Sequence, residues 1–211
     1  MTTAGADWIH VDVRDGRFVP KLTVGPLVIE AVRSSTDAPI DCHLMVADPD
    51  AQVEAFAAAG ADIISVHAEG VPHLHRTLSR IRDLGCSAGV ALNPGTSPSA
   101  VEEALFSGLV NVLVVMMVNG GFPGKAPFLP SQLDKIRRLR AMCDARSLST
   151  EIQADGGIDV ERARLCVEAG ATAVVAGGSV FRAPSYAEGI AALRMSAGAV
   201  APIPHAGPTH V

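Results

Sequence analysis

The stretch IHVDVRDG, residues 9–16, decides how the whole chain is interpreted. It has the pattern of a short β-strand that ends in a glycine turn, and side chains two positions apart in a strand share one face. His10 and Asp12 therefore point the same way, near the end of that strand. Both are metal-ligand residue types, and Asp12 can also act as an acid or base. Because α/β barrels carry their active sites at the carboxyl ends of parallel strands, we predict a site of that kind here.

Strands and helices are expected to alternate along the chain. The expected strands are residues 8–13, 40–46, 63–68, 88–92, 112–118, 151–155 and 173–176. Apolar residues spaced three and four apart predict helices at residues 26–33, 50–59, 74–84, 99–106, 131–144, 160–168 and 186–195. Ala-Gly-Ala precedes three of the strands, at residues 4–6, 59–61 and 169–171, as expected where glycine ends a helix. This alternation predicts βα units around a parallel sheet.

The number of units favours an incomplete barrel. Seven strands and seven helices are expected, whereas a closed (β/α)8 barrel has eight of each. We therefore predict an α/β fold, a TIM barrel truncated at its N-terminus to about seven βα units. Residues 1–195 would form this single domain. Residues 196–211, rich in Ala, Pro, Gly and His, would form a disordered tail.

Composition narrows the class of protein. The chain has 211 residues, a net charge of −5 and 48% hydrophobic residues. This charge gives no reason to expect nucleic acid or a membrane surface as a partner. The N-terminus lacks the features of a secretory signal, and the longest apolar run is too short to cross a bilayer. Four widely separated cysteines are typical of a reducing compartment. We expect a soluble, cytoplasmic protein.

Two further strand ends carry ligand-type residues. His43 lies in the second expected strand, and Asp155 ends the sixth. Taken singly, a strand histidine is more often a packing residue, and an aspartate before glycine more often forms a turn. Together with His10 and Asp12, they supply two imidazoles and two carboxylates at strand ends of one βα series. This set predicts a site for one divalent metal ion: zinc, iron(II), manganese or cobalt.

Glycine-rich segments follow the last three expected strands. They are Asn119-Gly120-Gly121-Phe122-Pro123-Gly124-Lys125, Gly156-Gly157 and Ala176-Gly177-Gly178-Ser179. In α/β barrels such loops offer main-chain N–H groups to a phosphate, so we predict that these loops bind the phosphate of a substrate. One glycine cluster alone is equally a tight turn, and Lys125 either adds positive charge or is simply exposed.

The remaining histidines give weaker signals. His67 ends the third expected strand, where packing and substrate contact are equally compatible with its position. His73 and His75 lie near a helix start, and His205 and His210 lie in the tail. We assign no role to these four.

Taken in order, the motifs resemble the ribulose-phosphate 3-epimerase family of phosphate-binding TIM barrels. The matching blocks are ADWIHVDVRDGRFVP, DCHLMV, GADIISVHAE, HLHRTL, GVALNPGT, IQADGGI and VVAGGSVF, and the resemblance covers residues 5–194. It implies an isomerase of carbohydrate metabolism that interconverts D-ribulose 5-phosphate and D-xylulose 5-phosphate, in the pentose phosphate pathway or in carbon fixation. It also implies a homo-oligomer, because members of the family are commonly oligomeric.

The resemblance implies roles for individual residues. His10, Asp12, His43 and Asp155 match the family's metal ligands, and Asp12 and Asp155 match its two acid/base residues. Positions that match substrate and phosphate contacts are His43, Gly121, Phe122, Pro123, Gly124, Gly156, Gly157, Gly177 and Gly178. Epimerisation removes a proton beside a ketone and returns one to the opposite face, which two carboxylates can perform. The family's metal stabilises the cis-enediolate that forms between the two steps.

The chain departs from the family's pattern at several positions. Arg14 stands where methionine is usual, and it can turn outward, pair with Asp15 or disturb the site. Gly120, Pro123, Lys125 and Gly178 replace a proline, a glycine, a glutamine and a serine. The family's first βα unit, which includes a serine that contacts substrate, has no counterpart. Three explanations of this difference compete. They are a start codon placed too late, a truncated copy with little activity, and completion of the barrel by another chain.

Other functions stay open on the sequence alone. An epimerase of another ketose phosphate, such as a hexulose 6-phosphate, would need only a pocket of different size. A truncated, non-catalytic barrel that binds a sugar phosphate is favoured by Arg14 and opposed by the complete ligand set. An aldolase or decarboxylase is disfavoured, because Lys21, Lys125 and Lys135 are all expected in loops or helices rather than at strand ends.

Overall fold

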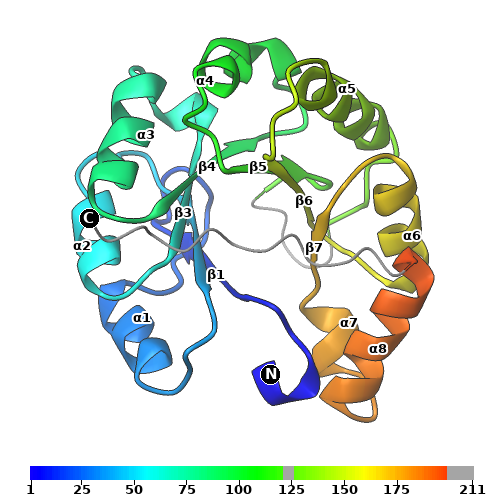
Figure 1. The fold of residues 1–211 in the computed structure, drawn as a ribbon. Helices are drawn as coiled ribbons and strands as arrows, with labels where there is room; N and C mark the ends of the chain where they lie inside the picture. Colours follow the sequence, from blue (N-terminus) through cyan, green and yellow to red (C-terminus); the bar gives the residue numbers. More distant parts are fainter. Residues whose placement is uncertain (121–125, 199–211) are drawn as a thin grey trace.

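A parallel sheet of seven strands, in the order β1-β2-β3-β4-β5-β6-β7, forms the centre of the molecule. The computed structural model describes residues 1–120 and 126–198. The strands are β1 (Ile9–Arg14), β2 (Ile40–Met45), β3 (Ile63–His67), β4 (Ser87–Leu92), β5 (Val112–Met116), β6 (Glu151–Asp155) and β7 (Ala173–Val175). In Figure 1 the strands curl inside a ring of helices. The fold is the incomplete TIM barrel that the sequence predicts.

Helices follow the strands and cover the outside of the sheet. They are α1 (Pro26–Arg33), α2 (Val53–Ala58), α3 (Leu74–Asp83), α4 (Glu102–Phe106), α5 (Gln132–Ala145), α6 (Val160–Glu168), α7 (Gly178–Phe181) and α8 (Tyr186–Ala197), with 3-10 turns at Thr2–Ala4, Ala68–Gly70 and Pro98–Val101. In the described part of the chain, no helix is long and apolar enough to span a membrane.

Side chains along each strand point alternately to the two faces of the sheet, and this separates two apolar layers. One set of strand residues, including Cys42, Leu44 and Val90, packs outward against the helices in the main core. The other set points into the concave side of the sheet, where a second apolar cluster comprises Ile63, Ala91, Val112, Val114 and Met116. Asp41 and His43 pair in register with Ile63 and Ser65 of β3, so they belong to the inward-facing set. The sheet register therefore directs polar residues into the middle of the half-barrel.

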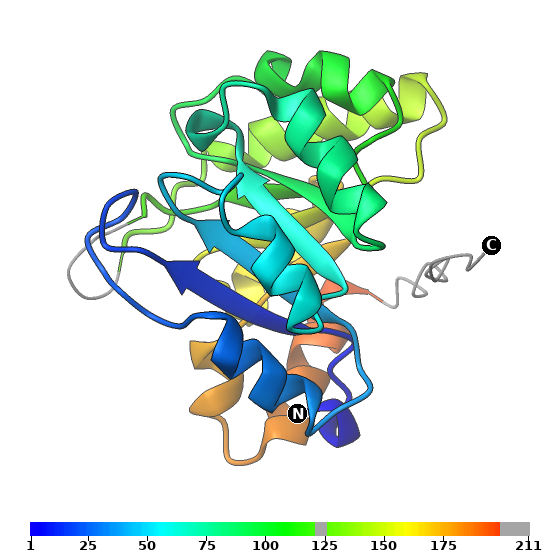
Figure 2. The same cartoon turned by 90° about the vertical axis from the view of Figure 1, so that its left-hand side faces the viewer.

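The carboxyl ends of the strands gather at one end of the molecule. Figure 2 shows the arrowheads of β1 and β2 there, together with the loop that follows β1. Because β1 and β2 pair in parallel with His10 opposite Asp41 and Asp12 opposite His43, the polar residues of both strands reach the same level. This end of the sheet carries the candidate site.

The N-terminal segment reaches the last helix. Arg194 of α8 donates to the main-chain oxygen of Gly5 at 2.9 Å and pairs with Asp7 at 2.5 Å. Figure 1 shows the N-terminus beside α7 and α8. Among the described residues no ladder joins β7 to β1, so side chains, and not strand pairing, connect the two ends of the ring.

Most expected elements are confirmed, and the differences have local causes. Helix α7 was not expected, because it is four residues long and starts inside the Gly177-Gly178 segment. The helix expected at residues 99–106 begins as a 3-10 turn with Pro98 in its first turn and becomes α4 only at Glu102. Helix α8 continues two residues past Met195 to Ala197. The tail residues 199–211 lie outside the described residues.

Gly89 in β4 should not tolerate a side chain. A Cβ atom at Gly89 would lie 2.0 Å from the Oγ atom and 3.0 Å from the Cα atom of Ser65, and Ser65 is fully buried. We expect Gly89→Ala to lower the free energy of unfolding by about 1–3 kcal/mol, measured by urea denaturation. Gly95→Ala is the control, since a Cβ there meets no atom within 4 Å. If overpacking is the cause, adding Ser65→Gly to Gly89→Ala should recover stability. A Gly89→Ala protein as stable as the wild type would contradict this explanation.

Candidate functional site

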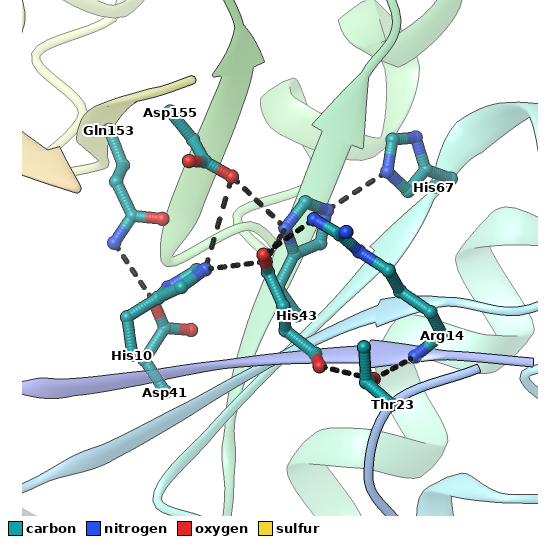
Figure 3. A network of polar contacts seen from close by, with 9 residues as sticks. His10, Arg14, Thr23, Asp41, His43, His67, Gln153 and Asp155 are labelled. Carbon is teal, nitrogen blue, oxygen red and sulfur yellow. Dashed lines mark hydrogen bonds and ion pairs between the residues drawn. The ribbon is translucent and has the colours of Figure 1, made fainter. Parts of the chain in front are cut away.

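Four side chains from three strands converge at the carboxyl end of the sheet. His10 and Asp12 come from β1, His43 from β2 and Asp155 from β6, as the sequence predicted. One possible ligand atom from each lies within 4.8 Å of the others. Figure 3 shows His10, His43 and Asp155 pointing toward one another. Strand alternation brings His10 and Asp12 to one face of β1, and the curvature of the sheet brings His43 and Asp155 to them from β2 and β6.

The distances within the cluster suit a small cation. His10 Nε2 lies 3.4 Å from Asp12 Oδ1 and 3.9 Å from Asp155 Oδ2. His43 Nδ1 lies 3.6 Å from Asp12 Oδ1 and 3.3 Å from Asp155 Oδ2. A tetrahedral ion with bonds of about 2.1 Å holds its ligand atoms about 3.4 Å apart. The cluster therefore has the spacing of a metal site.

Three of these atoms are buried and make no hydrogen bond to the described part of the chain. They are His10 Nε2, Asp12 Oδ1 and His43 Nδ1. Buried polar atoms normally have partners, because an unpaired one costs free energy. Together with Asp155 Oδ2 these three atoms form a set of two nitrogen and two oxygen donors, which fits a divalent cation.

The orientation of His10 is set by a carboxylate behind it. Its Nδ1–H donates to Asp41 Oδ2 at 2.7 Å, and Gln153 Nε2 donates to the same oxygen at 2.8 Å. Asp41 is fully buried. Burial opposes its ionisation, but His10 and Gln153 outweigh burial and lower the pKa of Asp41. Since Nδ1 is engaged, the Nε2 atom of His10 faces the cluster.

His43 is oriented by a second histidine. The carboxylate of Glu69 can only accept, so His67 Nδ1–H donates to Glu69 Oε2 at 3.1 Å. Burial lowers the pKa of His67, which favours its neutral form, and its Nε2 then accepts from His43 Nε2–H at 2.9 Å. The two rings also stack, with centroids 4.9 Å apart. His43 consequently turns its Nδ1 atom toward the carboxylates of the cluster.

The cluster favours positive charge. Burial opposes protonation of His10, yet Asp41, Asp12 and Asp155 together raise its pKa well above the usual value. Burial likewise opposes protonation of His43, and Asp12 and Asp155 raise its pKa. For Asp12 burial acts to raise the pKa, but His10 and His43 hold it well below the usual value. Protonated imidazoles or a metal ion can each balance these carboxylates.

Arg14 extends the cluster in an unexpected direction. Its Nη2 donates to Asp12 Oδ2 at 2.7 Å. The sequence left open an outward orientation, a pair with Asp15 or a disturbed site, and the observed partner is Asp12. Asp15 instead accepts from the main-chain N–H groups of Arg17, Phe18 and Ala47. Its carboxylate shapes the loop after β1 and is not available to Arg14.

A cavity of about 890 Å³ opens beside the cluster. Its lining includes the predicted site residues His10, Asp12, Asp155, Gly157, Gly177 and Gly178. This volume is within the usual range for small-molecule pockets. Ile158, Asp159, Arg162, Val175, Ser179 and Arg182 complete the lining. Two positive charges belong to this wall. Arg162 lies at Gly157, and Arg182 lies at Gly178.

The other predicted site residues are placed differently. His43 is fully buried and does not line the cavity. Gly156 also does not line it, and a Cβ there would lie 2.7 Å from Val118 Cγ2, which with a φ of 120° accounts for glycine at this turn. Gly121, Phe122, Pro123 and Gly124 lie outside the described residues.

Comparison with known proteins decides the family. The model of the ribulose-phosphate 3 epimerase family matches residues 1–181. The chain belongs to the ribulose-phosphate 3-epimerase family. It is 53% identical over 195 residues to the ribulose-phosphate 3-epimerase of Synechocystis, covering 92% of this chain and 84% of that protein. It is 48% identical over 193 residues to the enzyme of that name from Bacillus subtilis, covering 91% and 88%.

The chloroplastic ribulose-5-phosphate-3-epimerase of Arabidopsis thaliana is 50% identical over 195 residues, which cover 92% of this chain and 68% of that one. Solved structures of lower identity share the fold. KGPDC from Streptococcus mutans superposes with a TM-score of 0.67 at 17% identity, over 93% of this chain and 90% of the other. A 3-hexulose-6-phosphate synthase gives 0.65 at 21% identity, over 90% and 86%.

Asp41 should control the metal-binding strength of the cluster. We expect Asp41→Asn to weaken Zn²⁺ binding by about 10–100-fold, because His10 loses the carboxylate that fixes its orientation. Competition with a chromophoric chelator measures the dissociation constant. Asp37→Asn, at an exposed position, is the matched control and should bind Zn²⁺ like the wild type. Unchanged affinity in a folded Asp41→Asn protein would show that His10 does not depend on Asp41.

Proposed function

We propose that this chain interconverts D-ribulose 5-phosphate and D-xylulose 5-phosphate by proton transfer at C3. One observation carries the proposal: the carboxylates of Asp12 and Asp155, from β1 and β6, line one cavity. An oxygen of each belongs to the group whose atoms lie within 4.8 Å of one another. Membership of the family and the names of its curated relatives support the same reaction.

The two aspartates would divide the work of epimerisation. The proton at C3 is acidic because the neighbouring C2 is a ketone carbon. One carboxylate removes this proton, and the resulting cis-enediolate takes a proton from the other carboxyl on its opposite face. Positive charge in the cluster lowers the pKa of Asp12 and so favours its carboxylate form. That state suits a base that must accept a proton in one direction of the reaction.

We propose that His10, Asp12, His43 and Asp155 hold one divalent ion, zinc, iron(II), manganese or cobalt. Such an ion supplies positive charge beside the carbonyl and hydroxyl oxygens of the substrate. The histidines act as neutral ligands, oriented by Asp41 and by His67 with Glu69. His43 would contribute to substrate binding only through this cluster, since it is fully buried.

The phosphate end of the substrate would lie against the glycine segments. Gly157, Gly177 and Gly178, which the sequence analysis predicted to contact phosphate, line the cavity. We propose that their main chain holds the phosphate and that Arg162 and Arg182 balance its charge. Fixing the phosphate orients C3 toward the two aspartates, which turns binding energy into correct alignment.

We further propose that the chain works in the cytoplasm as a homo-oligomer. The four cysteines are buried free thiols, and burial with the charge of Asp41 raises the pKa of Cys42 to about 12. Such unreactive thiols suit a reducing compartment. Leu22, Leu27 and Met195 are at least 79% exposed and offer apolar surface to a second copy. Light scattering on the purified chain decides between one copy and several.

Removing either carboxyl charge should stop turnover. We expect Asp12→Asn and Asp155→Asn each to lower kcat for D-ribulose 5-phosphate by at least about 10²-fold, because an amide cannot transfer the proton. A coupled assay for D-xylulose 5-phosphate measures the rate, and circular dichroism checks the fold. Asp83→Asn, at an exposed position of α3, is the control. Full activity in either site variant would rule out the two-aspartate mechanism.

The purified protein should contain about one divalent ion per chain. His43→Ala removes a fully buried donor and should reduce the metal content to a small fraction of that value. Elemental analysis by plasma emission gives both numbers, and His43→Gln serves if the alanine variant is unstable. His75→Ala, at an exposed position of α3, should keep the full content. Wild-type metal content in both His43 variants would exclude His43 as a ligand.

A further inference from the structure

Arg14 contacts the cluster through Asp12, but the proposed chemistry does not use it. It is the last residue of β1, two positions after Asp12, so its side chain points into the same side of the sheet. The main chain around it is fixed by Thr23: Arg14 N–H donates to Thr23 Oγ1 at 2.9 Å, and Thr23 Oγ1–H donates to the main-chain oxygen of Asp12 at 2.7 Å. Figure 3 shows Arg14 and Thr23 beside the cluster.

The two oxygens of Asp12 face different partners. Oδ1 lies 3.4 Å from His10 Nε2 and 3.6 Å from His43 Nδ1, inside the cluster. Oδ2 accepts from the guanidinium of Arg14 at 2.7 Å. The Arg14 side chain is 26% exposed and that of Asp12 38%, so solvent screens this pair only in part. The carboxylate is thus shared between the cluster and a fixed positive charge.

A guanidinium in this position opposes a metal ion in two ways. It withdraws electron density from the carboxylate that would bind the metal, through a charge-assisted hydrogen bond. It also repels a divalent cation at close range, where partial burial weakens screening. In return, it balances the charge of Asp12 whenever the cluster holds no metal.

We propose that Arg14 competes with the divalent metal ion for Asp12 and sets the metal affinity of this chain. It is a positioning residue that keeps Oδ2 engaged and leaves only Oδ1 to the cluster. The inference rests on the proposed metal site, and it requires nothing of the epimerase reaction. A neutral side chain of similar length at position 14 raises metal affinity and removes the cation that stabilises the metal-free cluster.

The test compares Arg14→Met with the wild type. Dissociation constants for Zn²⁺ and Mn²⁺ come from chelator competition, and Tm is measured in EDTA and in saturating metal. We expect Arg14→Met to bind both ions at least about tenfold more tightly, which corresponds to about 1.4 kcal/mol. Its Tm should fall below the wild-type value in EDTA, and the gap should close or reverse in metal, because ligand binding stabilises the folded state.

Three further variants complete the design. Arg14→Gln is neutral and should follow Arg14→Met, which preserves the test if the methionine variant does not fold. Arg14→Lys keeps the positive charge and should stay within about threefold of wild-type affinity. Arg17→Met, which changes an exposed arginine in the loop that follows β1, should change neither affinity nor Tm.

Two outcomes would overturn the proposal. One is equal or weaker metal binding in both neutral variants. The other is a loss of Tm that is the same in EDTA and in metal, which would identify a purely structural ion pair. If the wild type does not convert D-ribulose 5-phosphate, that result would contradict the proposed reaction. It would not affect the proposal on Arg14, which the metal affinities and Tm values test separately.

Discussion

The hydrogen bond between His10 and the buried carboxylate of Asp41 is the interaction on which the geometry of the site depends. It joins β1 to β2 at 2.7 Å, and Gln153 brings β6 to the same oxygen at 2.8 Å. Burying a carboxylate costs free energy unless hydrogen bonds compensate, and here a histidine and an amide do so. Because both partners are needed, the three strands are held in one arrangement, and the four cluster residues lie on those three strands.

Much of the site could be predicted because one rule governs it. Parallel strands place alternate residues on one face and bring their carboxyl ends to one edge, so His10, Asp12, His43 and Asp155 were expected together. The same rule, applied one step further along β1 and β2, would have directed Arg14, two positions after Asp12, toward the cluster and would have found Asp41 two positions before His43. The sequence singled out Arg14 but left its direction open, and Asp41 was missed because an aspartate in a strand, taken alone, is an ordinary residue.

Other features depend on contacts that local patterns do not encode. Gln153 meets Asp41 across 112 positions of sequence, and only the curvature of the sheet brings them together. The link from His43 through His67 to Glu69 needs the rotamers of three side chains. Helix α7 covers four residues and begins at a glycine, so neither its length nor its composition gave a helical signal. The alternation of strands and helices was enough to predict the fold, but it did not predict the residues that orient the ligands.

The shared hydrogen bonds of Asp41 also have a mechanical consequence for an open sheet. Strand β1 lies at one end of the strand order, and β6 lies next to the other end. A link from His10 through Asp41 to Gln153 therefore runs as a chord across the curved sheet rather than along its ladder. Fluctuations that straighten the sheet must stretch this chord, so opening of β1 and of β6 should be coupled. The polar interior thus acts as a tie that limits how far the half-barrel can flex.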